Sequence, residues 1–309
     1  MKKYLILSTT LLTIFVIGSC KKDNSTTEGK PSLSGLSINA APAFVAVGDE
    51  FTFRANISSL GVSKGTLPTV GLYWQVNTAK KDTLTRDAAA TNPEYHYKVD
   101  SLGTYSVYCY AFGGSNYYNT SASSSFRAVD PAQVLSGLST AQEITAGGLT
   151  WQASNLNYQD AGLSFRDSKV LDSAVGRLYS WTEAQTVCPA GWHLPGEEDF
   201  STSFADTEGA ISAGALMAGA SFLGEEMWEY IPGVNITNSF GFNAIPLGYI
   251  DMVDPFTPYN KYGEYACYWT SSQEDGMGTY MYIYAAGKQM QKASGDKETL
   301  YMSVRCVKD

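Results

Sequence analysis

Apolar and polar residues alternate in short runs through residues 33–129. The clearest runs are 51–57, 70–76, 95–99 and 105–111, and turn signals separate them. A period of two is typical of strands that bury one face and expose the other. Because several short strands recur at this spacing without a helical period, the pattern predicts an antiparallel β-sandwich.

From residue 147 the pattern mixes helical and strand periods, which is typical of an α+β domain. Ser180 and Glu183 have the spacing of a capping box, so a short helix is predicted over 181–187. Three carboxylates at 197–199 predict a second helix start, because they complement the helix dipole there. Small and apolar residues predict a third helix over 210–228, broken near Gly219 and Gly224. Strands are predicted over 240–250, 266–272, 279–286, 287–292 and 300–307.

The first 19 residues have the features of a signal peptide. Two lysines precede an apolar stretch over 5–17 that is too short for a comfortable membrane span. The stretch ends in Ile-Gly-Ser before Cys20, which resembles a bacterial lipobox and implies lipidation of Cys20 after removal of residues 1–19. An uncleaved membrane anchor is the weaker alternative. Residues 20–32 offer nothing apolar to bury after the cysteine and predict a lipidated flexible tether.

The residues directly after Cys20 are Lys-Lys-Asp-Asn, which resembles the start of Bacteroidetes lipoproteins and their acidic surface-export signal. We therefore expect a protein anchored by lipid in the outer membrane and exposed at the cell surface, with a periplasm-facing position as the alternative. The net charge is −9, and removal of residues 1–19 leaves 19 basic against 30 acidic side chains, or −11. Without a basic stripe to neutralise phosphates, nucleic-acid binding is not expected.

Several sequence blocks in the C-terminal half occur in the order of one family. The first contains Asn155-Leu156-Asn157-Tyr158, and another is Cys-Pro-Ala-Gly-Trp-His-Leu-Pro over 188–195. Further blocks lie at 176–181, 241–249, 268–272 and 303–309. Together they resemble the Fibrobacter succinogenes major paralogous domain of Bacteroidetes lipoproteins over residues 147–309. The resemblance implies a C-type-lectin-like or formylglycine-generating-enzyme-like fold.

The predicted β-sandwich of residues 33–129 resembles immunoglobulin-like and polycystic-kidney-disease-type (PKD) modules of surface proteins. Trp74 has the place of the central core tryptophan, and Tyr105 that of a corner tyrosine. Phe53 and Val107 stand near the positions of the inter-sheet cysteine pair, so packing alone must hold this core. The whole chain is thus expected to be mostly β, with this domain as a spacer and residues 130–146 as a linker.

Apart from Cys20, four cysteines remain, and four cysteines allow three pairings. The family resemblance favours a disulfide between Cys188 and Cys306, because both lie in family blocks and lectin-like folds bring a segment after a helix beside the last strand. Cys109 and Cys267 fall in different predicted domains. We expect both to be unpaired and buried, with a bridge between the domains as the alternative.

The sequence contains no recognisable catalytic or metal-binding constellation. His96 and His193 are the two histidines, and paired His or Cys ligands at zinc-site spacing do not occur. The Gly-x-Ser-x-Gly elbow, the P-loop, the dinucleotide fingerprint and the sugar-binding motifs of calcium-dependent lectins do not occur either. Acidic stretches at 225–229 and 251–254 are more typical of a solvated surface than of a calcium site. We therefore expect no catalytic residue, metal or cofactor, and no enzymatic activity.

An aromatic recognition surface remains the best candidate for function. Phe256, Tyr259 and Tyr262 lie in a polar and aromatic loop between two family blocks. Rings with polar tips stack on sugars or become buried at protein interfaces. Aromatic residues on the neighbouring strands rank behind them, because alternate aromatics on strands are more often cross-strand packing. The sequence therefore predicts a non-catalytic recognition or adhesion module for a glycan or protein, with a structural component of a surface assembly as the alternative.

Overall fold

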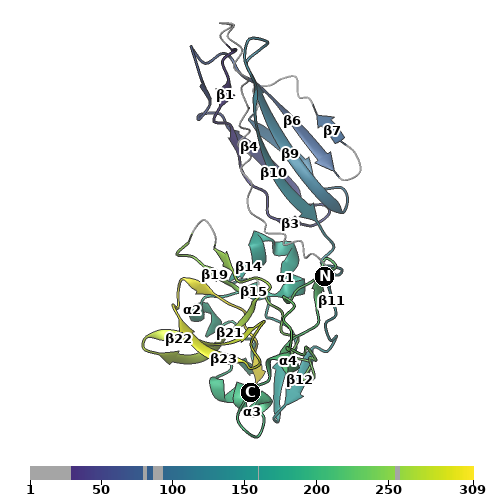
Figure 1. The fold of residues 1–309 in the computed structure, drawn as a ribbon, viewed down its shortest axis with the longest axis vertical. Coiled ribbons are helices and arrows are strands. Elements are labelled where there is room, and N and C mark those ends of the chain that lie inside the picture. The colour runs from purple at the N-terminus through teal and green to yellow at the C-terminus, as the bar shows by residue number, and fades with distance from the viewer. Residues whose placement is uncertain (1–28, 79–81, 86–92, 159, 255–257) are drawn as a thin grey trace.

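The computed structural model describes residues 29–78, 82–85, 93–158, 160–254 and 258–309. Two of the candidate residues, Cys20 and Phe256, lie outside these ranges. Figure 1 shows an N-terminal lobe of strands and a C-terminal lobe in which short strands and helices mix, stacked along the long axis. Strand residues far outnumber helical ones across the described ranges, so the chain is mostly β as predicted.

The N-terminal lobe is a β-sandwich. One sheet has the strand order β3-β10-β9-β6-β7 and the other β2-β4-β8, while β1 pairs with β5. The strand pairs of this lobe are antiparallel, except that β10 and β3 run parallel. The strands are β1 (Leu33–Ser34), β2 (Ser37–Ile38), β3 (Phe44–Val45), β4 (Glu50–Asn56), β5 (Gly61–Val62), β6 (Gly71–Thr78), β7 (Asp82–Thr85), β8 (Glu94–Lys98), β9 (Gly103–Phe112) and β10 (Thr120–Ala128).

Apolar side chains at alternate strand positions fill the space between the two sheets. Trp74, Phe53 and Val107 are almost completely buried, and the Phe53 ring lies 6.5 Å from the Trp74 ring. Phe53 and Val107 therefore provide apolar packing near the two positions where antibody-type domains have an inter-sheet cysteine pair. Tyr105 forms the expected corner, because its hydroxyl donates a hydrogen bond of 2.7 Å to the carbonyl of Ser101.

The C-terminal lobe is built from several small sheets and short helices. The sheets have the orders β12-β13-β25-β16, β21-β22-β23, β20-β19-β24, β11-β17-β18 and β14-β15. The strands are β11 (Leu135–Ser136), β12 (Glu143–Ala146), β13 (Leu149–Gln152), β14 (Leu163–Ser164), β15 (Arg177–Leu178), β16 (Trp192–His193), β17 (Ser221–Phe222), β18 (Glu225–Glu226), β19 (Tyr249–Asp251), β20 (Tyr259–Asn260), β21 (Tyr265–Glu274), β22 (Met277–Tyr284), β23 (Gln291–Gly295), β24 (Leu300–Tyr301) and β25 (Val307–Lys308). The helical segments are η1 (Phe165–Asp167), η2 (Lys169–Leu171), α1 (Asp172–Val175), α2 (Trp181–Ala184), α3 (Glu197–Phe204) and α4 (Ala213–Leu216).

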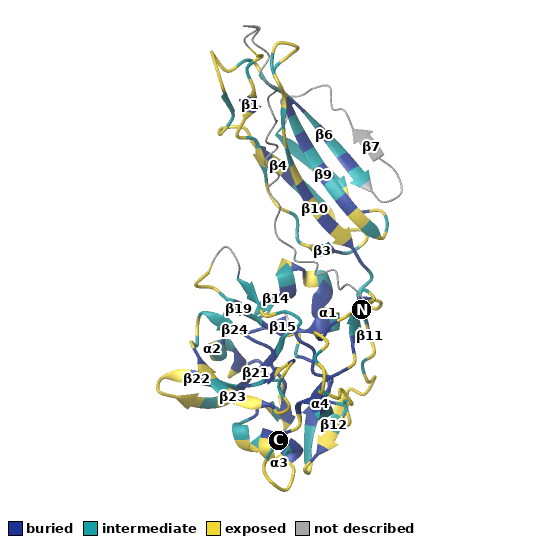
Figure 2. Cartoon of the chain, viewed as in Figure 1, coloured by how far each residue is buried: buried dark blue, intermediate teal, exposed yellow. Residues whose placement is uncertain are grey.

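Figure 2 shows buried segments in the interior of the C-terminal lobe and exposed ones at its periphery. The core of this lobe is centred on Trp151, which is fully buried. Its ring lies 4.8 Å from Phe200 and 5.1 Å from Phe204, which α3 places on one face at helical spacing. The indole N–H of Trp151 donates a hydrogen bond of 2.8 Å to Ser203 Oγ, so the polar atom of this ring is satisfied inside the core.

Both predicted helix starts are confirmed. Ser180 Oγ accepts a hydrogen bond of 3.2 Å from the backbone N–H of Glu183, and the Glu183 carboxylate accepts one of 2.9 Å from the backbone N–H of Ser180. This is the capping box that the spacing predicts. At α3, Asp199 accepts a hydrogen bond of 2.7 Å from the Gly196 N–H. The carboxylates at 197–199 thus belong to a helix start, where they complement the dipole.

The long helix predicted over 210–228 is wrong, since only Ala213–Leu216 is helical there. The small residues serve close backbone packing instead. A Cβ on Gly214 would lie 2.0 Å from the carbonyl oxygen of Asn235, and the Gly214 carbonyl accepts hydrogen bonds from the N–H groups of residues 237 and 238. Tertiary hydrogen bonds therefore replace the helical bonds that small residues with high helix propensity would otherwise form.

The two lobes meet at the end of the sandwich. The Phe44 ring on β3 packs edge-on against Phe222 on β17 at 5.4 Å, and the Phe44 N–H donates a hydrogen bond of 2.9 Å to Ser168 Oγ. Residues 130–146, which were expected to be a linker, contribute β11 and β12 to sheets of the C-terminal lobe. In the described ranges, no helix is both long and apolar enough to cross a bilayer.

A disulfide joins Cys188 to Cys306, 118 residues apart in the chain, and this is the pairing that the family resemblance implies. Cys109 and Cys267 are unpaired and buried in the cores of the N-terminal and C-terminal lobes. A bridge between them is therefore not formed.

The two free thiols should resist modification in the folded protein. Burial raises the pKa of both Cys109 and Cys267 to about 12, so neither forms appreciable thiolate at mildly alkaline pH. Iodoacetamide should leave both unmodified in buffer and should modify both in concentrated urea, as peptide mass mapping can show. Labelling of either cysteine in the folded chain, at the rate of a free thiol, would contradict this burial.

Candidate functional site

The expected loop aromatics take part in packing within the C-terminal lobe. The half-buried Tyr259 on β20 meets Phe165 edge-on at 6.2 Å, and the half-buried Tyr262 lies 5.5 Å from the same ring. The Arg166 guanidinium covers the Tyr262 ring at 4.9 Å. Burial raises the pKa of both tyrosines. The rings therefore stabilise the contact between residues 259–262 and η1.

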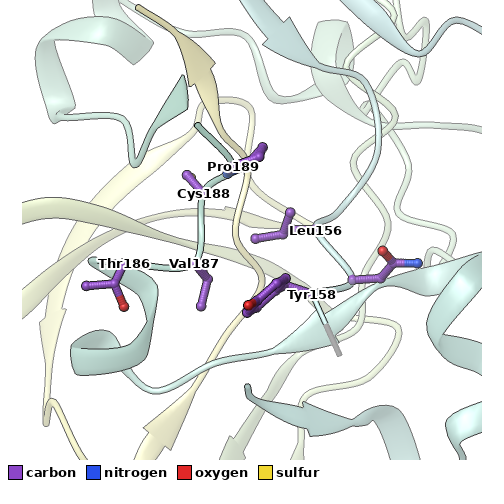
Figure 3. Close-up of a pocket in the computed structure, with 7 residues that line it drawn as sticks. Leu156, Tyr158, Thr186, Val187, Cys188 and Pro189 are labelled. Atoms are coloured by element: carbon purple, nitrogen blue, oxygen red, sulfur yellow. The ribbon is translucent and has the colours of Figure 1, made fainter. Parts of the chain in front are cut away.

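Two of the sequence blocks instead border an open groove. One wall is Leu156, Asn157 and Tyr158, which continue from β13, and the other is residues 186–189, which follow α2. The depression between them has a volume of about 370 Å³. Figure 3 shows Leu156 and Tyr158 on one side, facing Val187 and Cys188 on the other.

A second depression of about 250 Å³ adjoins the first and shares Leu156 and Asn157 with it. Its other lining residues are Gln142, Glu143, Gln152, Ser154, Asn155 and Trp192. We call the two depressions together the groove. It has an exposed aromatic residue, Tyr158, in the larger depression and a half-buried one, Trp192, in the smaller.

Hydrogen bonds to buried parts of the lobe hold the backbone of the first wall in place. The hydroxyl of the buried Tyr179 lies 3.3 Å from the carbonyl oxygens of both Leu156 and Tyr158, to which it can donate. The Leu156 N–H donates to the Val304 carbonyl, and its own carbonyl accepts from the Arg177 N–H. Because these bonds fix the backbone, the side chains of this wall point into the groove without a cost for ordering the loop.

The second wall is fixed by the disulfide and by a tight turn. Gly191 has a φ of +81°, a left-handed conformation that glycine adopts without strain. This turn lets the Trp192 N–H donate to the Pro189 carbonyl at 3.0 Å and directs the chain into β16. β16 pairs with β25, where Cys306 lies one residue before Val307. The proline-rich block is therefore a framework that also positions Trp192.

The groove combines aromatic rings with uncharged amides. The amide side chains are those of Gln142, Gln152, Asn155 and Asn157. Gln152 Oε1 is buried without a hydrogen-bond partner among the described residues. The charges at the groove are paired, because Lys308 Nζ lies 3.9 Å from Glu143 Oε2 and 5.5 Å from the centre of the Trp192 ring.

The contacts of His193 do not form a nucleophile–base pair. Its Nδ1 lies 2.8 Å from Asp309 Oδ1, and its Nε2 lies 3.7 Å from Asp199 Oδ2. Within the part of the chain that the structure describes, the His193 ring makes polar contacts with these two carboxylates and with no serine or cysteine. Among the described residues there is no cluster of three or more His, Cys, Asp or Glu side chains that could hold a metal ion.

Sequence reasoning identified both walls of the groove, but only as framework blocks of a family. A tyrosine after an Asn-Leu-Asn motif, and a tryptophan after a glycine turn, were the available signals. Their proximity depends on β25, which brings the second block beside β13.

No curated protein matches the chain. Among solved structures, the chain is similar to the PKD domain of human KIAA0319, with 11% identity over 35% of this chain and 91% of that one, at a TM-score of 0.23. It is also similar to the Yersinia pseudotuberculosis adhesin InvE, with 11% identity over 90% of this chain and 70% of that one, at a TM-score of 0.28. These scores are too low to identify a shared fold or function. The sequence model of the Fibrobacter succinogenes major domain matches residues 144–308, which are more than half of the chain. The chain therefore belongs to the Fibrobacter succinogenes major domain family.

Proposed function

We propose that this protein is a lipid-anchored, non-catalytic recognition module of the cell envelope, which binds its ligand in the groove. The observation that carries the proposal is the open groove with Tyr158, Trp192 and uncharged amides on two rigid walls. A concave, preformed site with convergent polar groups is the usual form of a small-ligand site. The fold of this lobe is proposed to be C-type-lectin-like, as the family resemblance implies.

A glycan fits the chemistry of the groove better than a peptide. Amide side chains donate to and accept from sugar hydroxyls, and an aromatic ring covers the apolar face of a sugar. The volume of the larger depression, about 370 Å³, lies within the range of small-ligand pockets. Because Lys308 and Glu143 neutralise one another beside Trp192, the groove offers no unpaired charge to select an ionised ligand.

The anchor and the lobes suggest how the groove is presented. Lipidation at Cys20 and the tether over 20–32 would attach the chain to the outer membrane, and the β-sandwich would hold the groove away from the lipid surface. Recognition without catalysis agrees with the surroundings of His193, which has two carboxylates and no nucleophile among its recorded contacts.

A glycan array tests this proposal. The full chain in mild detergent would be applied to immobilised host and dietary glycans, with calcium and with a chelator. Tyr158→Ala should weaken binding at least about tenfold, because a central aromatic side chain commonly contributes 2 kcal/mol or more. Tyr230→Ala is the matched control, since Tyr230 is 72% exposed and lies outside the groove lining.

Three results would contradict the proposal. One is glycan binding that Tyr158→Ala leaves unchanged, and another is release of sugars from the array with time. The third is a blank array together with cross-linking of the chain to itself on intact cells, which would favour a structural component of a surface assembly. Sensitivity of binding to the chelator would show a calcium requirement.

A further inference from the structure

The outer face of the larger N-terminal sheet has an unusual composition. On its three central strands, β6, β9 and β10, the register places the outward side chains in rows across the sheet. The three central rows are Tyr73, Tyr110 and Ser121, then Gln75, Tyr108 and Ser123, then Asn77, Ser106 and Ser125. We call these residues, with Phe112 at one end, the tyrosine–serine face.

Aromatic rings on this face are ordered by one another. Tyr73 and Tyr110 stack with ring centres 4.6 Å apart, and Tyr108 lies 6.0 Å from Tyr110 along the same strand. The Phe112 ring reaches across to β6, because a Cβ on Gly71 would lie 2.3 Å from its Cζ atom. Gly71 therefore provides the space in which this ring lies against the sheet. The rings lose little conformational freedom when a ligand binds, which lowers the cost of binding.

The polar groups of the face are also ordered, and they are uncharged. Gln75 Nε2 donates a hydrogen bond of 2.6 Å to Asn77 Oδ1, and the hydroxyls of Ser106 and Ser125 lie 3.0 Å apart. On β6, β9 and β10 the three rows contain no carboxylate, ammonium or guanidinium group, and at the edge of the sheet the register places Asp82 of β7 opposite Asn77. Arg127, at the end of β10, is the nearest charged residue on the outward side of that strand.

On β6, β9 and β10 the same rows contain no Leu, Ile, Val or Met side chain, and the register places Leu84 of the edge strand β7 opposite Gln75. An anionic ligand would require cations, which the rows do not provide. Hydroxyls, amides and tyrosine rings without charge instead match a ligand that is itself uncharged and rich in hydroxyls.

We infer that the tyrosine–serine face binds a neutral polysaccharide chain. Tyrosine rings and their hydroxyls contact the sugar rings, and the serine and amide rows exchange hydrogen bonds with sugar hydroxyls along the extended chain. A sheet face suits an extended polymer, whereas the groove of the other lobe is concave. The inference goes beyond the proposed function, because it gives the β-sandwich a binding role in addition to its role as a spacer.

Affinity electrophoresis tests the inference. The full chain in mild detergent would be run through native gels that contain dextran, mannan or xylan, with alginate as the charged counterpart. At least one neutral polysaccharide should retard the wild-type chain, and alginate should not. Ser123→Glu places a charge at the centre of the face on an exposed side chain and should weaken the retardation at least about fivefold. Tyr108→Ala should weaken it similarly.

Two controls separate this face from other sites. Ser37→Glu makes the same substitution on an exposed residue of the opposite sheet and should leave retardation unchanged. Tyr158→Ala should also leave it unchanged, although it should abolish the array signal of the groove. Absence of retardation by all three neutral polysaccharides would overturn the inference. Retardation that survives both Ser123→Glu and Tyr108→Ala would overturn it as well, as would retardation that depends on Tyr158 alone.

Discussion

Replacing Arg305 with methionine should destabilise the C-terminal lobe by at least about 3 kcal/mol, because the buried acceptors that the guanidinium bonds lose their donor. The guanidinium is 1% exposed. It donates hydrogen bonds to Asn155 Oδ1 at 2.9 Å and to the carbonyls of Gln152, Phe242 and Asn243 at 3.1, 2.6 and 3.1 Å. Methionine fills a similar volume but leaves these buried acceptors without donors, at a cost of about 1–3 kcal/mol each.

Arg305 remains charged at neutral pH, although its surroundings disfavour the charge. Burial lowers its pKa to about 10, still well above neutrality. The recorded acceptors are carbonyls and an amide, with no carboxylate among the described residues, and the Phe242 ring lies 4.5 Å from the guanidinium carbon. The residue therefore ties β13, the 242–243 segment and the last strand together through shared hydrogen bonds.

Urea denaturation of the full chain, followed by tryptophan fluorescence, checks this prediction. Arg54→Met is the matched control, because Arg54 is exposed and pairs with Glu94 at the surface, where ion pairs contribute little. The control should keep the wild-type transition. A wild-type midpoint for Arg305→Met would show that the buried network does not hold the lobe.

Removing the disulfide should have an effect of similar size. The bond between Cys188 and Cys306 closes a loop with a sequence separation of 118 residues, for which the chain-entropy model gives about 4–5 kcal/mol of stabilisation. The double substitution Cys188→Ala and Cys306→Ala should therefore lower the unfolding midpoint of the C-terminal lobe. The N-terminal lobe should unfold as before, because its core contains neither residue.

Reducing agent provides the control for the disulfide prediction. Dithiothreitol should lower the midpoint of the wild-type chain and should have no further effect on the double variant. Mass spectrometry would establish that the bond is reduced under the conditions of the melt. An unchanged wild-type midpoint after complete reduction would contradict a stabilising role.

The local structure was largely readable in the sequence. The alternation from Phe51 to Ala55 and through residues 105–111 is the burial pattern of β4 and β9, because one face of each strand packs against the other sheet. Ile57, the last residue of the first predicted run, lies beyond β4 and is exposed. The Ser180 capping box was also predictable, since it depends on two residues three positions apart. Such features are local, and their physical cause lies within a few residues.

Features that depend on long-range packing were not readable in the same way. The segment 210–228 has the composition of a helix, but the Gly214 carbonyl bonds to backbone N–H groups more than twenty residues later. Tyr259 and Tyr262 have the composition of a recognition loop, but Phe165 and Arg166 fold against them. In each case a partner distant in the chain decided the outcome.

The two proposed binding surfaces illustrate the same limit. Alternation assigns Tyr73 and Tyr110 to the outward side of their strands, yet only the register shows that they stack across β6 and β9. Likewise, the Asn155–Tyr158 motif and Trp192 are visible in the sequence, but the pairing of β16 and β13 with β25 brings them to one groove. The residue types were available, and their arrangement required the fold.

The most direct test of recognition in the groove follows the tryptophan indole N–H resonances of the nitrogen-15-labelled full chain. The chain has six tryptophans, and Trp192 alone among them lines the groove, so a glycan from the array should shift its resonance and leave that of the half-buried Trp181 in place. Tyr158→Ala should remove the shift at the same glycan concentration. A saturating glycan that leaves the Trp192 resonance unmoved, or that is converted to a product during the titration, would contradict the account.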